Sequence, residues 1–257
     1  MGLKPQLFGS VIKMSRLIFA TLALHSFLRY AQNDAIGIAL RMTLQTFYIF
    51  SHQKAKIQIK NIMRLEVHPE NPQARIVKQA AEILEDDGLV LYPTESGYAI
   101  GCNAESSKAI HKLYALKKPM KKFFMALIVP DIRFATGYAH VSNFAFNIIK
   151  QRVPGPYTFI LPADPHIARK LDVKRPEIGI RIPTHPFFKE LFQHFDKPIL
   201  STAAKLSDED IYETDDLWKT FQHSVDMMVD CGNIEINPTN VVSLVGDSVE
   251  VIRGELV

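Results

Sequence analysis

Short apolar runs alternate with stretches of helical periodicity from residue 64 onward, and this alternation is the clearest pattern in the chain. Residues 74–84 place their apolar side chains on one helical face, and residues 106–116 form a second such stretch that opens with a serine cap. Two further helices are predicted at residues 144–151 and 186–195. Extended or apolar runs predict strands at residues 64–69, 88–92, 125–129, 157–161, 178–182, 198–200, 227–229, 241–244 and 249–252. This order indicates an α/β domain with a mixed, twisted sheet.

The stretch from Tyr92 to Cys102 follows a buried strand and is rich in polar groups. Pro93 is expected to end that strand, because proline cannot donate to a ladder. Hydroxyl and carboxylate groups then come in close succession, at Thr94, Glu95, Ser96 and Tyr98. Ligands of open α/β sheets bind at the carboxyl ends of strands. Since proline, serine and glycine also suffice for a turn, this stretch by itself fits a binding site and an ordinary turn equally well.

The composition limits the class of protein. With 257 residues, of which 47% are hydrophobic and 22% charged, the chain can bury one sizeable core. Cys102 and Cys231 cannot form a disulfide framework, so they indicate thiols in a reducing, cytoplasmic compartment. The spacing of histidines, cysteines and acids predicts no protein-bound metal.

The net charge of +3 divides unevenly along the chain. Residues 1–62 carry eight Lys or Arg side chains and one acid, Asp34, whereas residues 63–257 carry 22 basic and 26 acidic groups. The basic character therefore belongs to the first segment. A global electrostatic argument for nucleic-acid binding by the main body fails, although a local basic patch stays possible.

Residues 1–62 differ from the rest of the chain in composition, and three interpretations are open. A membrane span is disfavoured because the apolar run at residues 17–28 is well short of the roughly 20 residues required. A targeting peptide fits the basic composition, but no clear cleavage signal follows. The favoured interpretation is an N-terminal extension outside the fold, or an upstream start, since Met63 directly precedes the first predicted strand. The folded domain is then residues 63–257, with no membrane partner.

Four lysines gather just after the second predicted helix, at Lys117, Lys118, Lys121 and Lys122. Cations at a solvated helix end are common, because they complement the helix dipole. In an otherwise acidic domain the same cluster suits a polyphosphate. Arg181 lies in an extended apolar segment and needs an anionic partner, either an internal acid such as Glu95 or a ligand carboxylate or phosphate.

Other predicted strands also end in hydroxyls or cations. Ser201, Thr202 and Lys205 follow one strand, and Arg253 ends another. The chain shows no serine-histidine-acid order that would indicate a hydrolase. Most of its scattered histidines are expected to have surface or capping roles.

The order of the motifs resembles the YrdC/YciO family over roughly residues 64–257. The resemblance rests on Pro93 to Gly101, Pro154 to Thr158, Arg181 to Pro183, Pro238 to Val242 and Arg253-Gly254. The opening motif from His68 to Gln73 is similar to the YciO branch in particular. The resemblance implies a YrdC-like twisted mixed sheet with flanking helices and a concave cationic surface.

The resemblance also implies a reaction, in which L-threonine, bicarbonate and ATP give threonylcarbamoyl-adenylate for tRNA modification. Such a nucleotidyltransferase needs positioning and charge neutralisation more than a strong base, and Mg²⁺ accompanies ATP. By the resemblance, Thr94 and Tyr98 line the threonine and adenylate pocket, and Lys117 and Lys118 meet phosphates. Arg181 holds an anionic group, and Ser201 and Thr202 lie beside the nucleotide. The predicted binding site also includes Thr158, Lys205 and Arg253.

Two departures from the family pattern leave a second function open. The synthases carry Lys-x-Arg-Pro where this chain has Lys117-Lys118-Pro119, and Ser-x-Asn where it has Ala203-Ala204-Lys205. The first change removes a bidentate phosphate ligand, and the second removes neutral hydrogen-bonding groups, although Lys205 can supply a point charge. The alternative is a YciO-type protein without synthase activity. It would bind double-stranded RNA or tRNA, or act on threonylcarbamoyl-adenosine in tRNA.

Overall fold

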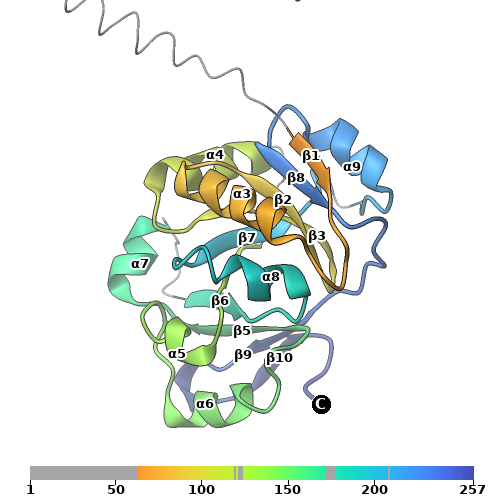
Figure 1. Cartoon of the computed structure of the whole chain (residues 1–257). Coiled ribbons are helices and arrows are strands. Elements are labelled where there is room, and N and C mark those ends of the chain that lie inside the picture. Colours follow the sequence, from red (N-terminus) through yellow and green to blue (C-terminus); the bar gives the residue numbers. More distant parts are fainter. Residues whose placement is uncertain (1–62, 119, 121–123, 172–176, 208) are drawn as a thin grey trace, which may run out of the picture. The chain divides into compact units, whose positions relative to one another are not determined.

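The fold consists of a large mixed sheet with helices packed on both of its faces (Figure 1). A computed structural model describes residues 63–118, 120, 124–171, 177–207 and 209–257. The predictions for residues 1–62, Pro119, Lys121 and Lys122 lie outside the described residues.

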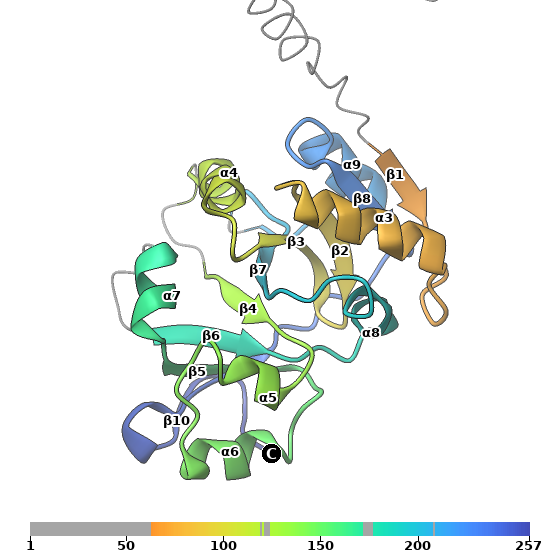
Figure 2. The same ribbon diagram turned by 60° about the vertical axis from the view of Figure 1, so that its left-hand side comes forward.

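The described strands form one ten-stranded sheet in the order β1-β8-β2-β3-β7-β4-β6-β5-β9-β10. Their bounds are β1 Met63–Glu66, β2 Val90–Thr94, β3 Gly97–Asn103, β4 Ala126–Ile128, β5 Tyr157–Pro162, β6 Glu177–Arg181, β7 Ile199–Ala203, β8 Met227–Asp230, β9 Asn240–Ser243 and β10 Glu250–Arg253. The pairs β1/β8, β8/β2, β4/β6 and β5/β9 are parallel, and the other neighbours are antiparallel. In Figures 1 and 2, β1 and β8 lie at one end of the sheet, while β10 and α6 lie at the other.

The described helices are short segments between these strands. They are α3 Ala74–Glu85, α4 Ser107–Lys117, α5 Ile132–Ala135, α6 Asn143–Ile149, α7 Pro165–Lys170, α8 Pro186–Leu191 and α9 Thr214–Phe221, with a 3-10 turn η1 at Val245–Asp247.

Two apolar clusters cover opposite faces of the sheet, because successive residues of a strand point to opposite sides. In β2, Leu91 enters the larger cluster, which also holds buried residues of α4, α6 and α9. Its neighbours Val90 and Tyr92 enter the smaller cluster with α3 and α8. Among the described residues, the smaller cluster has no member from β5, β6 or β9. The described helices therefore leave part of one face of the sheet uncovered by the rest of the described chain.

Most predicted elements are confirmed, with boundary shifts of a few residues. The helix predicted at residues 74–84 is α3, and its buried side chains are those of the predicted apolar face. Ser106 caps α4, since its Oγ accepts a hydrogen bond from the Ala109 amide at 3.1 Å. A mixed, twisted α/β sheet with flanking helices, the predicted fold class, is what the structure shows.

The prediction that Pro93 ends its strand is wrong. Strand β2 continues through Pro93 to Thr94, and Gly97–Asn103 forms a second strand that pairs with it as a hairpin. On its other side β2 pairs with β8 only at Val90 and Leu91. Pro93 therefore lies where β2 has a single neighbour, and a missing amide donor is tolerated there.

Three helices were not predicted from the sequence, namely α5, α7 and α9. The first two contain only four and six residues, too few to show a helical period. Each begins with a capping aspartate, Asp131 and Asp164, whose side chain accepts a backbone hydrogen bond. Helix α9 opens with two acids, which suit the positive end of a helix dipole.

Gly101 of β3 lies close to side chains of both neighbouring strands, β2 and β7. A Cβ atom at this position would lie 2.3 Å from the Tyr92 hydroxyl oxygen and 2.6 Å from a methyl group of Ile199. Glycine is thus required here so that the Tyr92 ring can cross the strand and donate to Ser201 Oγ at 2.7 Å. Within the described part of the chain, no helix is long and apolar enough to span a bilayer.

Candidate functional site

The uncovered part of the sheet presents a floor of mostly small residues, here called the open face and defined as Ala126, Thr158, Ile160, Gly179 and Ser243. These residues are half-buried, whereas their strand neighbours Leu127, Phe159, Ile178 and Ile180 point into the core on the other side. The pairing register places Ser201, Ala126, Gly179, Ile160 and Ser243 directly opposite one another, strand by strand. A flat ligand can lie on such a row, because most of its side chains are small and project little above the sheet.

Gly179 occupies the centre of this floor. A Cβ atom there would approach Thr158 Cγ2 to 3.0 Å and Ala126 Cβ to 3.3 Å. Both distances are tighter than ordinary van der Waals contact, so glycine permits β5, β6 and β4 to lie side by side at this level. The sequence gives no sign of this role until the register of the strands is known.

Arg181 lies two residues beyond Gly179 on the same side of β6 and forms a shielded ion pair. Its Nη2 donates to Glu95 Oε1 at 2.8 Å and to Ser96 Oγ at 2.9 Å, and both charged side chains are less than a fifth exposed. The internal acid that the sequence suggested is therefore present. Arg181 Nε and Glu95 Oε2 are buried without a hydrogen-bond partner among the described residues. An unsatisfied buried donor and acceptor are costly, so this pair has unused binding capacity.

Thr94 and Tyr98 hold the β2–β3 hairpin in shape. Thr94 Oγ1 donates to the Gly97 carbonyl at 2.7 Å and accepts from the Ser96 amide at 3.1 Å. The Tyr98 hydroxyl donates to the Gly232 carbonyl and accepts from the Cys231 amide, both at 2.9 Å. Burial raises the pKa of this phenol, so it stays protonated. Both hydroxyl groups are thus engaged within the protein, while the turn between them presents Glu95 and Ser96.

Lys117 is almost fully buried at the end of α4. Its ammonium donates to the Ala203 carbonyl at 2.6 Å and to the Lys205 carbonyl at 2.5 Å. Burial, together with the nearby Lys205 charge, lowers the pKa of Lys117 to about 8. The neighbouring Lys118 is exposed. Of the two lysines assigned to phosphates, Lys117 is held by the turn after β7 and Lys118 points to solvent.

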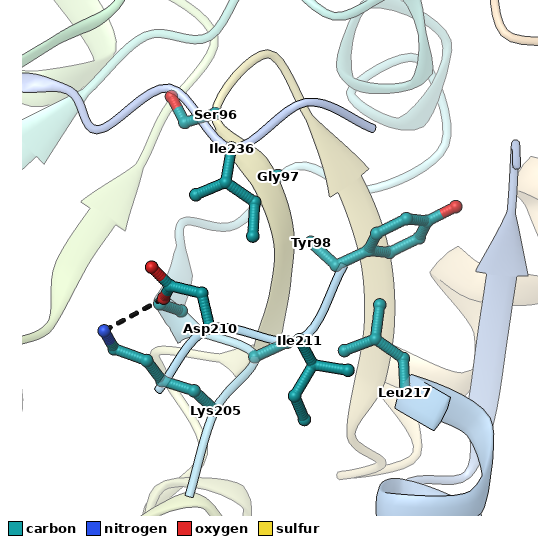
Figure 3. A pocket seen from close by; sticks show the side chains of 10 residues that line it. Ser96, Gly97, Tyr98, Lys205, Asp210, Ile211, Leu217 and Ile236 are labelled. Carbon is teal, nitrogen blue, oxygen red and sulfur yellow. Dashed lines mark hydrogen bonds and ion pairs between the residues drawn. The ribbon is translucent and has the colours of Figure 1, made fainter. Parts of the chain in front are cut away.

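A small cavity lies beside the hairpin, between Ser96, Gly97 and the turn after β7 (Figure 3). Its volume is about 40 Å³, and Ala203, Ile211 and Ile236 contribute much of its apolar lining. Lys205 and Asp210 face each other across one end, with Lys205 Nζ 3.0 Å from Asp210 Oδ1 (Figure 3). The Tyr98 ring is directed away from this pair (Figure 3). Ser96 therefore joins the cavity to the Arg181 ion pair.

The remaining predicted residues lie in two places, at β7 and beside Thr239. Ser201 lies on the same side of the sheet as the open face, where it is buried and accepts from Tyr92, while Thr202, the next residue of β7, points to the opposite side. Thr158 and Arg253 meet through Thr239. The two threonine hydroxyls are 3.5 Å apart, and Arg253 donates to the Thr239 carbonyl and hydroxyl at 2.8 and 2.9 Å.

His185 precedes α8 and belongs to the polar surroundings of Glu95. Its Nδ1 accepts from the Phe187 amide at 3.2 Å, which is the capping role expected for most histidines of this chain. Burial lowers the pKa of His185, and the negative charges of Glu95 and Glu70 oppose that shift. The imidazole is therefore neutral near pH 7, with Nδ1 as the acceptor.

Comparison with known proteins gives these groups a context. The model of the Sua5/YciO/YrdC family, described as telomere recombination, matches residues 82–254. The chain belongs to this family. The match spans the β2–β3 hairpin, Arg181, the turn after β7 and Arg253, so the whole arrangement described above lies within it. The predicted family is confirmed.

Individual relatives agree with this assignment. The chain is 36% identical over 191 residues to a protein of Haemophilus influenzae, and 34% identical over 190 residues to YciO of Escherichia coli K12. Each match covers 73% of this chain and 92% of the relative. It is also 32% identical to a threonylcarbamoyl-AMP synthase of Psychromonas ingrahamii over 134 residues, which are 51% of this chain and 70% of that enzyme.

Solved structures share the fold. The crystal structure of E. coli YciO matches with a TM-score of 0.69 and 32% identity, covering 74% of this chain and 94% of that one. Sua5 of P. abyssi in complex with L-threonine matches with a TM-score of 0.65 at 21% identity, covering 71% of this chain and 54% of Sua5. The structures confirm a YrdC-type sheet, and the second likeness shows the fold alone.

The structure adds residues that sequence patterns did not identify as parts of a site. Ser96 and Thr239 join predicted residues, Asp210 pairs with Lys205, and Gly179 with Ala126 forms the floor. Only the pairing register and the loop paths bring them together. Ser96 and Thr239 had a visible signal, because Ser96 lies inside the polar stretch from Tyr92 to Cys102 and Thr239 lies inside the motif from Pro238 to Val242.

Proposed function

We propose that this chain binds an adenine nucleotide and L-threonine on the open face and forms threonylcarbamoyl-adenylate from ATP, L-threonine and bicarbonate. The observation that carries the proposal is the Arg181 ion pair beside a floor of mostly small residues. Arg181 is held through Nη2, and its Nε remains unpartnered among the described residues. A guanidinium binds phosphates and carboxylates through N–H groups of this kind, so Arg181 keeps a donor for an anionic ligand.

The chemistry needs little more than positioning. The amine of threonine and bicarbonate give a carbamate and one water molecule, and a carbamate oxygen attacks the α-phosphate of ATP with release of pyrophosphate. Holding the two reactants in line converts this into a unimolecular step, and fixed cations stabilise the developing charge. Arg181 and Lys205 are the cations that would meet the anionic groups. Mg²⁺ would arrive with the ATP phosphates, as part of the substrate.

Family context supports the proposal at the level of the ligand class. The synthase of P. ingrahamii is a relative by sequence, and Sua5 shares the fold and binds L-threonine. The product would serve the threonylcarbamoyl-adenosine modification of tRNA in the cytoplasm.

The experiment is a direct assay of the full-length chain. Incubated with ATP, L-threonine, bicarbonate and Mg²⁺, it should release pyrophosphate and accumulate the adenylate, which chromatography detects. Arg181→Lys keeps the charge but loses the planar fork, so kcat/KM should fall on the order of tenfold or more. Arg133→Lys is the matched control and should leave the rate unchanged, because Arg133 is exposed on α5, which packs against the other face of the sheet. Absence of both products from the wild-type chain would exclude synthase activity.

A second function is favoured by one specific contact. The Lys117 ammonium is used by the Ala203 and Lys205 carbonyls, and no arginine follows it in the motif. A protein with these features could bind an already formed threonylcarbamoyl-adenosine in tRNA without making the adenylate. This alternative predicts tighter binding of an anticodon stem-loop that carries the modification than of the unmodified stem-loop. Equal affinities, measured by fluorescence anisotropy, would count against it.

A further inference from the structure

The Lys205–Asp210 pair is the charged feature of the cavity beside the hairpin. Lys205 stands in the turn after β7, and Asp210 lies five residues further along the chain. Among the described residues that line the cavity, these two carry the formal charges. Their side chains are 29% and 37% exposed, so water and small ions reach both of them.

The backbone of Lys205 is fixed, while its side chain is free to exchange partners. The carbonyl of Lys205 accepts from the buried ammonium of Lys117, which anchors the turn. The Lys205 ammonium has one described hydrogen bond, which it donates to the Asp210 carboxylate. Exposed pairs of this type contribute little to stability, so a stronger anion can replace the carboxylate.

The cavity matches a small anionic group in size. Its volume of about 40 Å³ exceeds the roughly 10–15 Å³ that one water molecule requires by the same measure. It does not accommodate a whole nucleotide. A terminal phosphate of a polyphosphate can enter it, with the rest of the ligand lying towards Ser96 and the open face.

We infer that Asp210 is an internal competitor for Lys205, so that a polyphosphate binds at this end of the cavity only by displacing the Asp210 carboxylate. The inference rests on the proposed function, because it names the residues that receive the phosphates of that ligand. Asp210 opposes binding in two ways. It occupies the cation that the phosphate needs, and its charge repels a phosphate that comes within a few ångströms.

The inference predicts that removal of the Asp210 carboxylate increases the affinity for ATP. Asp210→Asn removes both the competing partner of Lys205 and a negative charge, so it should tighten the binding of ATP. Exposed ion pairs are worth a few tenths to one kcal/mol, which corresponds to about a two- to fivefold lower Kd. The gain should shrink as salt is raised from about 50 to 300 mM, because ions screen both the pair and the repulsion.

The test measures ATP and inorganic pyrophosphate binding to the full-length chain by calorimetry, in four variants. These are the wild type, Asp210→Asn, Lys205→Gln and the double variant. The gain from Asp210→Asn should be clearly larger when Lys205 is intact than in the Lys205→Gln background, where only the relief of repulsion remains, and the difference is the coupling energy of a double-mutant cycle for the pair. Lys205→Gln preserves the backbone carbonyl that Lys117 binds, and thermal unfolding verifies that each variant is folded.

Asp216→Asn is the matched control. Asp216 forms a similar ion pair with Lys219 at 2.8 Å on α9 and does not line the cavity, so its removal changes the net charge equally. This control should leave the Kd for ATP unchanged. The inference is overturned if Asp210→Asn binds ATP no more tightly than the wild type, or if Asp216→Asn produces the same gain.

The two proposals fail in different ways. If pyrophosphate binds and Asp210→Asn tightens it while no adenylate forms, the synthase function fails and the role of Asp210 stands. If adenylate forms normally and Asp210→Asn brings no gain, the role of Asp210 alone is lost. If neither ligand binds to the wild type or to Asp210→Asn, both are overturned.

Discussion

At the scale of single residues, the candidate site is distinguished by charged groups whose partners lie within the protein. The Lys117 ammonium is buried and donates to two carbonyls, and Arg181 is shielded beside Glu95. Burial of a charge is costly unless it is compensated by hydrogen bonds or an opposite charge. Such residues hold neighbouring groups in place.

The first prediction concerns Lys117. Its pKa is lowered to about 8 from the ordinary 10.5, so between these values the unfolded chain binds more protons than the native chain. Stability therefore rises with pH in this window, as the unfavourable buried charge is removed. In Lys117→Met this contribution is absent. Urea titrations from pH 7 to 10.5 should show the wild type gaining free energy of unfolding relative to the variant.

The control for this prediction is Lys118→Met, which removes an exposed lysine from the adjacent position. Its stability should follow that of the wild type across the pH range. Parallel curves for wild type and Lys117→Met would show that Lys117 does not titrate with a lowered pKa. At pH 7 Lys117→Met should itself be less stable by about 1–3 kcal/mol, because two carbonyls lose their donor.

At the scale of elements, the β2–β3 hairpin is the unit that creates the site. Its two strands are buried throughout, and its turn carries Glu95 and Ser96 to Arg181 on β6 and to the cavity. Tyr98 fixes the turn end of the hairpin to the turn after β8. Helix α4, which packs against β3, begins with a side-chain cap.

The second prediction tests that cap. Ser106→Ala removes the oxygen that accepts from the Ala109 amide, leaving a donor of the first turn of α4 without its partner. The free energy of unfolding should fall by about 0.5–2 kcal/mol, measured by chemical denaturation at pH 7. Ser106→Thr retains the hydroxyl and should recover most of the loss. Equal stability of Ser106→Ala and wild type would mean that solvent satisfies this amide equally well.

At the scale of the whole molecule, the uneven distribution of charge along the chain distinguishes two kinds of partner, small anions and RNA. The eight basic residues of positions 1–62 outnumber their single acid, while residues 63–257 have more acids than bases. The cations of the candidate site, Arg181 and Lys205, have acidic partners. Small anions can bind by exchanging these partners, whereas the long-range attraction of RNA needs unpaired positive charge.

The third prediction follows from this distribution. If the full-length chain binds double-stranded RNA or tRNA, Lys54, Lys56 and Lys60 are expected to contribute to the phosphate contacts. Replacing all three with glutamine should reduce the slope of log K against log salt by up to about 3, since each contact contributes about 0.9. The measurement is a binding titration at several salt concentrations.

The control variant replaces three lysines of the described domain, Lys108, Lys112 and Lys219, which are exposed. Its slope should stay close to that of the wild type. The reverse result, a reduced slope for this control only, would place RNA binding on the folded domain and support the tRNA-binding alternative.

Much of the fold was predictable from the sequence because its signals are local. The apolar face of α3, the Ser106 cap and the runs that became β4, β5, β6 and β8 depend on residues within a few positions of one another. The order of the motifs was likewise sufficient to identify the family, because a motif is defined by residues that are close together in sequence. Pro93 misled because a proline normally stops a strand, and only the absence of a second neighbour at that level permits β2 to continue.

The chemistry of the site depended on tertiary structure. The site brings together residues from separate parts of the sequence, namely Glu95 with Arg181, and Thr239 with Thr158 and Arg253. These contacts arise from strand order and register. Polar residues at strand ends were visible in the sequence, but whether a lysine faces solvent, two carbonyls or an aspartate was not. The sequence thus determined the family, most of the elements and the residue types available for binding, because these are set by local pattern. The pairing of those residues, and therefore which charges can meet a ligand, was decided by packing over long distances along the chain.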